Sequence, residues 1–271
     1  MLQTILSRSK EPYYQYEPYL NRSDGQPGWQ WKFISCAGEK NVKGRIACGA
    51  NRIGKTEQGA YEAVLAVTGQ HPTRTFPAQG LGWIVGLDAN MVNQIDRPMF
   101  EKFLPARYKT KFHRQQNIWT CKADGREWTI VFKSCEMGAD KFQGAKVDFV
   151  WIDEEPRNTD LFKEMEARLI DRRGIWWMTA TPVRGTAWLK QTMERPDVAY
   201  TFAGMRENPY LPIEEVEAFA AGLDEDERAV RVDGRYIIFG GRPVFVRQKM
   251  QAMLDKAGTW RKEHGFLREA I

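Results

Sequence analysis

Residues 49–56 read Gly49, Ala50, Asn51, Arg52, Ile53, Gly54, Lys55 and Thr56. They match G-x-x-x-x-G-K-[ST], the phosphate-binding loop known as Walker A. The stretch RIACG (45–49) before the loop predicts a short buried strand, and the apolar spacing over 55–68 predicts a helix. Glycines let backbone N–H groups approach phosphate oxygens, and a helix N-terminus attracts negative charge. We therefore expect this loop to bind the phosphates of ATP.

A second motif downstream completes a nucleotide site. Residues 147–155 read VDFVWIDEE, an apolar strand that ends in carboxylates, as a Walker B strand does. We expect Lys55 to reach the β- and γ-phosphates, and Thr56 and Asp153 to hold Mg²⁺, Asp153 through water. Glu154 is expected to polarise the attacking water. If the loop upstream were absent, Glu154 and Glu155 would be explained almost as well by an ordinary strand followed by the acidic first turn of a helix.

Two further signals near these motifs are weaker. Arg52 lies within the loop, where a guanidinium contacts the charge that develops on the γ-phosphate, although an exposed side chain is an equal alternative. A polar turn follows the apolar run 175–178 and reads Thr179, Ala180, Thr181 and Pro182. Its hydroxyl groups are placed to sense the γ-phosphate, but such turns are also common in ordinary loops.

Two residues outside the motifs are also candidates. Gln30 stands between two tryptophans upstream of the loop, and its amide suits the adenine edge. The alternative is an aromatic patch that packs a helix onto the sheet. Arg168, on the helix expected after the Walker B strand, is a candidate arginine finger for a neighbouring subunit. The alternative, which local sequence favours, is a helix residue in a salt bridge.

The composition excludes several classes of protein. With 42% hydrophobic and 28% charged residues, the 271-residue chain forms a substantial core rather than a disordered or fibrous structure. A net charge of +5 permits a nucleic-acid partner without establishing one. The four cysteines form no C-x-x-C pair and the three histidines share no ligand spacing, so we expect free thiols and no metal site built from them. No apolar run has the length of a membrane span, which favours a soluble intracellular protein.

Short apolar strands alternate with helical patterns along the chain. Strands are expected over 45–49, 82–87, 118–122, 127–133, 149–153 and 174–179, and helices over 55–68, 91–103 and 161–170. Asp124-Gly125 indicates a hairpin, and two short acidic helices are expected from Ile213 and from Asp224. Strands joined by helical crossovers predict an α/β fold, with a mainly parallel sheet covered by helices on both faces.

We predict three parts of the chain. Residues 1–205 form the P-loop core with an N-terminal segment on the adenine side, and 206–241 form a small helical lid or linker. The remaining tail, 242–271, is basic and mixed.

The order of these motifs resembles the ATPase domain of the bacteriophage terminase large subunit, the motor that packages DNA into preformed capsids. The similar stretches are, in order, GANRIGKT (49–56), HP (71–72), WIVGLD (83–88), FKSCEMGADKFQG (132–144), VWIDEEP (150–156), ARLIDRRG (167–174), TATP (179–182), ENPYLP (207–212) and DEDERAVRVDGRY (224–236). The separate stretches are moderately specific and their ordered sum is highly specific.

The resemblance implies an additional-strand, RecA-like P-loop fold and Mg²⁺-dependent hydrolysis of ATP coupled to movement of double-stranded DNA. It also implies a homo-oligomeric ring, contacts with a portal protein and a terminase small subunit, and a location at the procapsid in the host cytoplasm rather than in the mature virion. Residues 179–182 become the coupling motif, Gln30 an adenine contact and Arg52 a catalytic or sensing arginine. Arg168 gains no support from it.

Two alternative functions remain open at this stage. A helicase-like, nucleic-acid-dependent ATPase also suits these motifs, but it needs a second motor lobe, for which the residues after Pro182 are too few. A nucleotide-dependent assembly protein without turnover needs only binding. Glu154 directly after Asp153 favours turnover, because a site that only binds has no need of a carboxylate that polarises water.

Large terminases usually carry a second, ribonuclease-H-like nuclease domain that binds two metal ions. The stretch 242–271 is shorter than a domain of ordinary size, so we predict no nuclease activity from this chain. The measurement is cleavage of plasmid DNA with Mg²⁺ or Mn²⁺. Equal cutting by the wild-type chain and a nucleotide-site variant would contradict the prediction.

Overall fold

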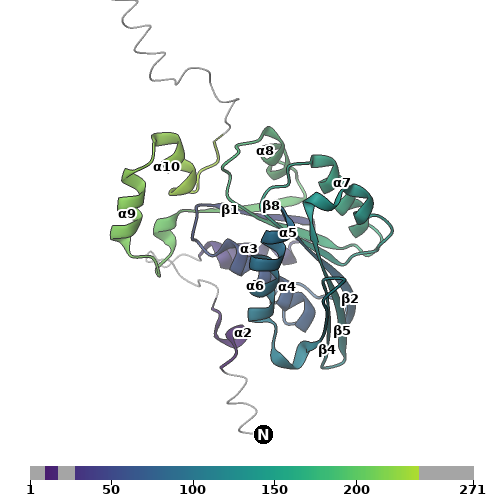
Figure 1. The fold of residues 1–271 in the computed structure, drawn as a ribbon. Helices are drawn as coiled ribbons and strands as arrows, with labels where there is room; N and C mark the ends of the chain where they lie inside the picture. Colours follow the sequence, from purple (N-terminus) through teal and green to yellow (C-terminus); the bar gives the residue numbers. More distant parts are fainter. Residues whose placement is uncertain (1–9, 18–27, 238–271) are drawn as a thin grey trace, which may run out of the picture. The chain divides into compact units, whose positions relative to one another are not determined.

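The computed structural model describes residues 10–17 and 28–237 of the chain (Figure 1). Contacts between residues divide the chain into two units, 1–237 and 238–271, and all described residues belong to the first. The predicted tail 242–271 therefore lies outside the described residues. The boundaries expected near residues 205 and 241 stay predictions.

One eight-stranded sheet organises the described chain, in the order β3-β4-β5-β2-β6-β7-β1-β8. The strands are Gly44–Gly49 (β1), Gln79–Gly86 (β2), Lys109–His113 (β3), Ile118–Ala123 (β4), Arg126–Ser134 (β5), Phe149–Asp153 (β6), Ile175–Ala180 (β7) and Val198–Ala203 (β8). Neighbouring strands are parallel from β5 through β8, and β3 and β4 add an antiparallel edge. The prediction of a mainly parallel α/β sheet is confirmed.

Strand β7 lies between the loop strand β1 and the Walker B strand β6. This inserted strand defines the additional-strand class of P-loop folds, which the resemblance implied. Cys48 of β1 is in register with Ala180 of β7, and Thr179 is in register with Asp153 of β6. The carboxyl ends of the three strands therefore meet at one edge of the sheet, where parallel α/β proteins bind their ligands.

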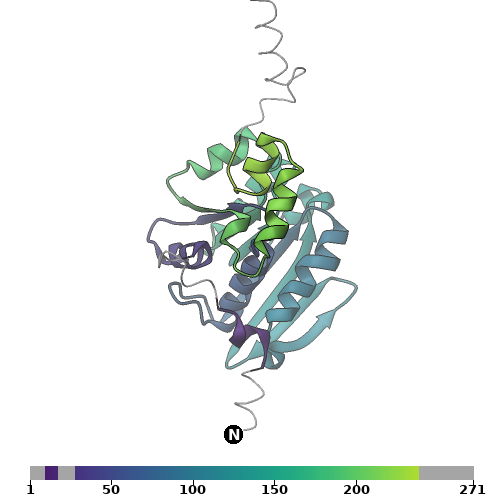
Figure 2. The same ribbon diagram turned by 90° about the vertical axis from the view of Figure 1, so that its left-hand side faces the viewer.

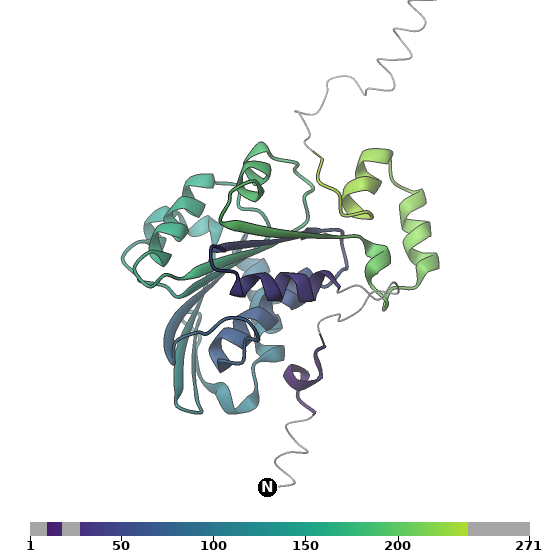
Figure 3. The same ribbon diagram turned by 180° about the vertical axis from the view of Figure 1, so that it is seen from behind.

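Helices cover both faces of the sheet (Figures 1 and 3). They are Pro12–Gln15 (α2), Trp29–Ser35 (α3), Lys55–Thr68 (α4), Ala89–Met91 (α5), Arg97–Phe103 (α6), Thr159–Leu169 (α7), Ala187–Met193 (α8), Ile213–Ala221 (α9) and Glu225–Arg231 (α10). Helices α3, α4 and α6 pack on one face, and α7 and α8 on the other. Helices α9 and α10, in yellow-green, lie side by side in Figure 2. No helix among these is long and apolar enough to cross a membrane.

Most differences from the predicted elements are at the edge strands of the sheet and where one expected helix is interrupted. Strands β3 and β8 and helices α2 and α8 were not predicted, and α3 was expected only in the alternative interpretation of the tryptophans beside Gln30. Strand β8 is an edge strand whose burial alternates, so it lacks a continuous apolar run. The single helix expected over 91–103 is instead α5, a π-helical turn at Val92–Asp96, and α6. Pro98 has no N–H group with which to continue the α-helical ladder, which accounts for this change in hydrogen bonding.

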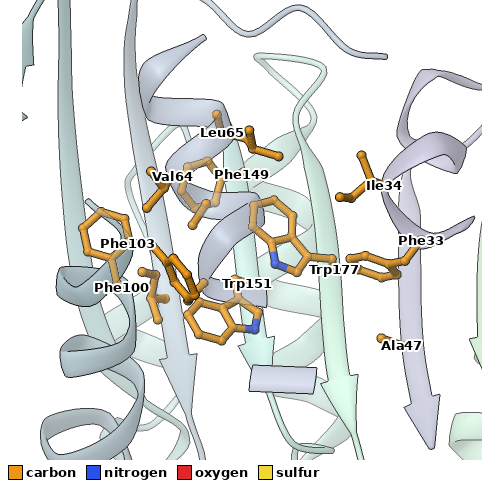
Figure 4. Packing of buried hydrophobic residues seen from close by; sticks show 14 of the residues in the cluster. Phe33, Ile34, Ala47, Val64, Leu65, Phe100, Phe103, Phe149, Trp151 and Trp177 are labelled. Carbon is orange, nitrogen blue, oxygen red and sulfur yellow. The ribbon is translucent and has the colours of Figure 1, made fainter. Parts of the chain in front are cut away.

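Large aromatic side chains fill the core between the sheet and α4 (Figure 4). Phe149 of β6 stacks on Trp177 of β7, with ring centroids 4.9 Å apart, and Trp128 of β5 stacks on the other side at 5.6 Å. These rings are fully buried, so side-chain packing connects β6 to its neighbour β7 and, across the intervening β2, to β5.

A buried ion pair lies within this core. Arg45 of β1 donates to Glu62 of α4 at 2.5 Å, and its guanidinium lies over the rings of Phe33 (4.8 Å) and Trp177 (5.5 Å). His71 contacts the same Glu62 oxygen at 2.7 Å, so this carboxylate has two partners in the core. Burial alone would raise the pKa of Glu62, but Arg45 and His71 hold it below its ordinary value.

Glu62→Gln should lower the free energy of unfolding by about 3–5 kcal/mol, because it leaves the Arg45 charge buried without its partner. Urea unfolding followed by tryptophan fluorescence measures the loss. The folded pKa of Glu62 lies below its unfolded value, so its contribution is present above the unfolded value and disappears as the pH falls through the folded one.

The matched control is Glu127→Gln, which removes an exposed pair with Lys122. We expect a loss of only about 0–1 kcal/mol there. Equal losses in the two variants, or a Glu62→Gln loss that grows at acid pH, would contradict the assignment.

Candidate active site

The loop 49–56 joins β1 to the N-terminus of α4, as the sequence predicted. Gly54 is its helix cap with φ = 83°, a left-handed conformation that favours glycine. The Lys55 ammonium group lies within the loop and donates to the carbonyls of Gly49 (3.2 Å) and Ala50 (2.6 Å). Burial lowers the pKa of Lys55, while Glu154 and Asp153 act in the opposite direction. A cation is therefore held where the loop receives phosphate.

Asp153 connects the loop to the sheet. Its carboxylate accepts a hydrogen bond from Thr56 of the loop at 2.9 Å and another from Thr179 of β7 at 2.5 Å. The Thr179 hydroxyl in turn accepts from the Trp151 indole at 2.9 Å. Burial raises the pKa of Asp153, and the two threonine hydroxyls oppose that change. The structure thus brings together the two residues that the sequence assigned to Mg²⁺.

Glu154 is fixed by the turn after β7. Its carboxylate accepts from the Thr181 N–H group at 3.0 Å and from the Thr181 hydroxyl at 3.3 Å. Its backbone has φ = 68°, which is rare and strained for a residue other than glycine, and such strain clusters at functional sites. Burial first, and Asp153 second, raise the pKa of Glu154 to about 7. The turn and the Walker B carboxylate are therefore in direct contact.

An open cavity of about 340 Å³ lies next to Lys55, Thr56 and Glu154. It is lined by Asn51, Arg52, Gly54, Lys55, Thr56, Glu57, Glu154 and Thr181. The cavity joins a cation and a helix N-terminus on one side to a carboxylate on the other. This arrangement suits a polyphosphate held next to an activated water.

Gln30 and Arg52 border the same loop. Gln30 of α3 is buried, and its Nε2 lies 3.4 Å from where a Cβ on Gly54 would stand. It donates to the Tyr16 hydroxyl at 3.2 Å, and Tyr16 donates to Gln58 at 3.1 Å. The Arg52 side chain is exposed and lines the cavity. Their roles toward adenine and γ-phosphate stay predictions.

Arg168 lies apart from these groups. It pairs with Glu164 at 2.8 Å one helical turn away, which is the salt bridge that the alternative interpretation expected. Its carbonyl accepts from Val147 N–H, just before β6 and thus at the end of that strand opposite to Asp153. The proposed contact of Arg168 with a neighbouring subunit stays a prediction.

The helical segment after β8 contacts the loop, which the sequence did not indicate. The Asn51 N–H group donates to the Arg231 carbonyl of α10 at 3.1 Å. The Asn208 amide donates to the Arg52 carbonyl at 2.6 Å. Residues far along the chain from the loop therefore hold its backbone from outside. No local pattern predicts such a contact, because it depends on where β8 places the segment.

Sequence reasoning also missed Asp96. It ends the π-helical turn, is fully buried, and lies beside Asp153. Burial, together with Asp153, raises the pKa of Asp96 far above its ordinary value. A single aspartate within an expected helix gives no signal of this placement.

The fold and the site define an additional-strand P-loop protein of the RecA-like class. The chain belongs to the phage terminase large subunit family, because the family described as terminase large subunit, T4likevirus-type, N-terminal, matches residues 46–210. The resemblance drawn from the motifs is confirmed. No curated protein matches the chain.

Solved structures of phage terminases share the fold. The ATPase domain of the Thermus phage P74-26 large terminase is 18% identical with a TM-score of 0.57, over 78% of this chain and 94% of that one. The large terminase of a second phage, a thermophilic one, is 17% identical with a TM-score of 0.66, over 82% of this chain and 57% of that one. We call it the thermophilic-phage terminase. The HK97 bacteriophage large terminase is 13% identical with a TM-score of 0.54, over 93% and 52%. The chain thus spans just over half the length of the last two proteins.

Thr179→Val should lower the free energy of unfolding by about 1–3 kcal/mol, because it leaves the buried Trp151 N–H group without an acceptor. It also removes one of the two threonine donors to Asp153. Urea unfolding measures the effect. Thr192→Val is the control, since that buried hydroxyl contacts only a carbonyl four residues earlier on its helix. An equal loss of unfolding free energy in both variants would show that the contacts of Thr179 stabilise the fold no more than the hydrogen bond of Thr192 within its helix.

Proposed function

We propose that this chain is the ATP-hydrolysing subunit of a phage DNA-packaging motor, which moves double-stranded DNA into the procapsid. Family membership supports the packaging role. The observation that carries the enzymatic part is the meeting of Lys55, Asp153 and Glu154 at one strand edge, each held by a defined contact. The thermophilic-phage terminase has been solved with ADP and with ATP-γ-S, which supports ATP as the nucleotide here.

The loop residues bind and orient the substrate in this proposal. Backbone N–H groups of the loop and the N-terminus of α4 receive the phosphate oxygens. Lys55 exchanges its two carbonyl partners for phosphate oxygens, which offer it full negative charge. Arg52, at the cavity wall, contacts the γ-phosphate, and Gln30, next to Gly54, contacts adenine.

The residues at the strand edge fit a magnesium ion. A hydroxyl and a carboxylate, Thr56 and Asp153, are oxygen ligands of the kind Mg²⁺ prefers, and they already lie 2.9 Å apart. Bound Mg²⁺ supplies neutralisation of the phosphate charge. Thr56 would hold it directly, and Asp153 would hold its water.

Glu154 would orient and polarise the water that attacks the γ-phosphate. A pKa near 7 suits a group that accepts a proton at neutral pH. Because Thr181 donates twice to this carboxylate, loss of the γ-phosphate would reach the turn 179–182 through Glu154. The turn thereby couples hydrolysis to movement.

The proposal extends to partners and location. The chain would act as a homo-oligomeric ring at the portal protein, together with a terminase small subunit, in the host cytoplasm rather than in the mature virion. Arg168 is the candidate arginine finger between subunits. The absence of nuclease activity stays a prediction.

Steady-state ATP hydrolysis with and without long double-stranded DNA tests the proposal. We expect hydrolysis that rises with DNA and falls by about 10²–10⁴-fold in Glu154→Gln, which keeps ATP bound. Lys55→Ala should abolish phosphate binding. Glu155→Gln is the matched control, because that neighbouring carboxylate accepts from Thr186 instead of Thr181.

The outcomes separate the alternatives. Nucleotide binding without Glu154-dependent turnover would favour an assembly protein. Stimulation by single-stranded nucleic acid in preference to duplex would favour a helicase-like enzyme. Equal ATP affinity in Lys55→Ala and the wild-type chain would remove the assignment of the loop.

A further inference from the structure

Asp96 is a buried carboxylate that lies in contact with a second carboxylate, Asp153. Its side chain is fully buried, and the hydrogen-bond partner of its carboxylate among the described residues is another acid, Asp153. Asp153, by contrast, accepts from Thr56 and Thr179. Buried acids in folded proteins are nearly always paired with donors or cations, so two buried carboxylates in contact next to a nucleotide site indicate a missing cation.

The position of Asp96 is set by the sheet. Val85 of β2 is in register with Ile152 of β6, so Gly86 follows at the level of Asp153. A Cβ on Gly86 would stand 2.3 Å from an Asp96 carboxylate oxygen, so only a glycine leaves room for this carboxylate at the strand end. The π-helical turn at Val92–Asp96 presents it there, and single π-turns are frequent at functional sites.

Burial and three neighbouring acids have the strongest effect on Asp96. The groups that act on it most strongly are Asp153, Asp88 and Glu154, all of them acids. The lysine of the site, Lys55, donates to the loop carbonyls of Gly49 and Ala50. Two adjacent carboxylates that are both buried need a cation or a proton between them. A divalent cation with its water shell offers both charge and donors.

We propose that Asp96 is a second carboxylate of the magnesium site and accepts hydrogen bonds from metal-bound water beside Asp153. This inference rests on the proposed function, since it concerns the same nucleotide site. It assigns the acceptor oxygens of Asp96 to the water shell of the ion, and it gives Gly86 the role of keeping space for that carboxylate. Such outer carboxylates tune metal affinity by orienting the ligands of the ion.

Binding of Mn²⁺ to the full chain with ADP, followed by electron paramagnetic resonance of free Mn²⁺, tests the proposal. We expect Asp96→Asn to weaken Mn²⁺ binding by about 10–100-fold. ADP affinity measured with EDTA should be unchanged, because Asp96 is not among the residues that line the cavity. Gly86→Ala should weaken Mn²⁺ binding in the same direction, since its added methyl group displaces the carboxylate without removing it.

Glu155→Gln is again the matched control, because it removes a buried carboxylate two residues from Asp153 that contacts Thr186. Its Mn²⁺ affinity should equal that of the wild-type chain. Unchanged Mn²⁺ affinity in both Asp96→Asn and Gly86→Ala would overturn the proposal and identify Asp96 as a protonated packing residue. If the wild-type chain itself bound no Mn²⁺ with ADP, both the role of Asp96 and the proposed function would be contradicted.

Discussion

The hydrogen bonds that converge on Asp153 hold the site together. One carboxylate joins the loop after β1, through Thr56, to strand β7, through Thr179. It can do so only because β7 lies between β1 and β6, which brings three strand ends to one edge. The stacked rings of Trp128, Phe149 and Trp177 then fix the spacing of the strands beneath it. Sheet order, aromatic core and site chemistry are thus parts of one arrangement.

Local sequence signals predicted the parts of this arrangement that are local. The loop, the strand that ends in Asp153 and the helix over Lys55–Thr68 each have their own pattern, and each lies where the pattern indicated. The mainly parallel sheet followed from the alternation of strands and helices. Edge strand β8 did not, because its half-exposed residues lack a continuous apolar run.

Features that depend on distant parts of the chain were not predictable. The contact of Thr181 with Glu154 requires β6 and β7 to be neighbours, which spacing alone does not specify. The placement of Asp96 depends on a π-turn and on the room left by Gly86. The shared fold at 13–18% identity to solved phage terminases is consistent with this division, since the same fold forms although most residues differ.

The hydrogen bond from Asn51 to Arg231 has a mechanical consequence. A loop of this kind binds an anion through its backbone N–H groups. The Asn51 N–H group, however, already donates to the Arg231 carbonyl in the last turn of α10. An anion that recruits the Asn51 N–H group must first displace the Arg231 carbonyl, and α10 then loses this hold on the loop, while the contact from Asn208 to Arg52 is left in place. Binding of an anion in the loop and attachment of α10 to the loop consequently compete for the Asn51 N–H group.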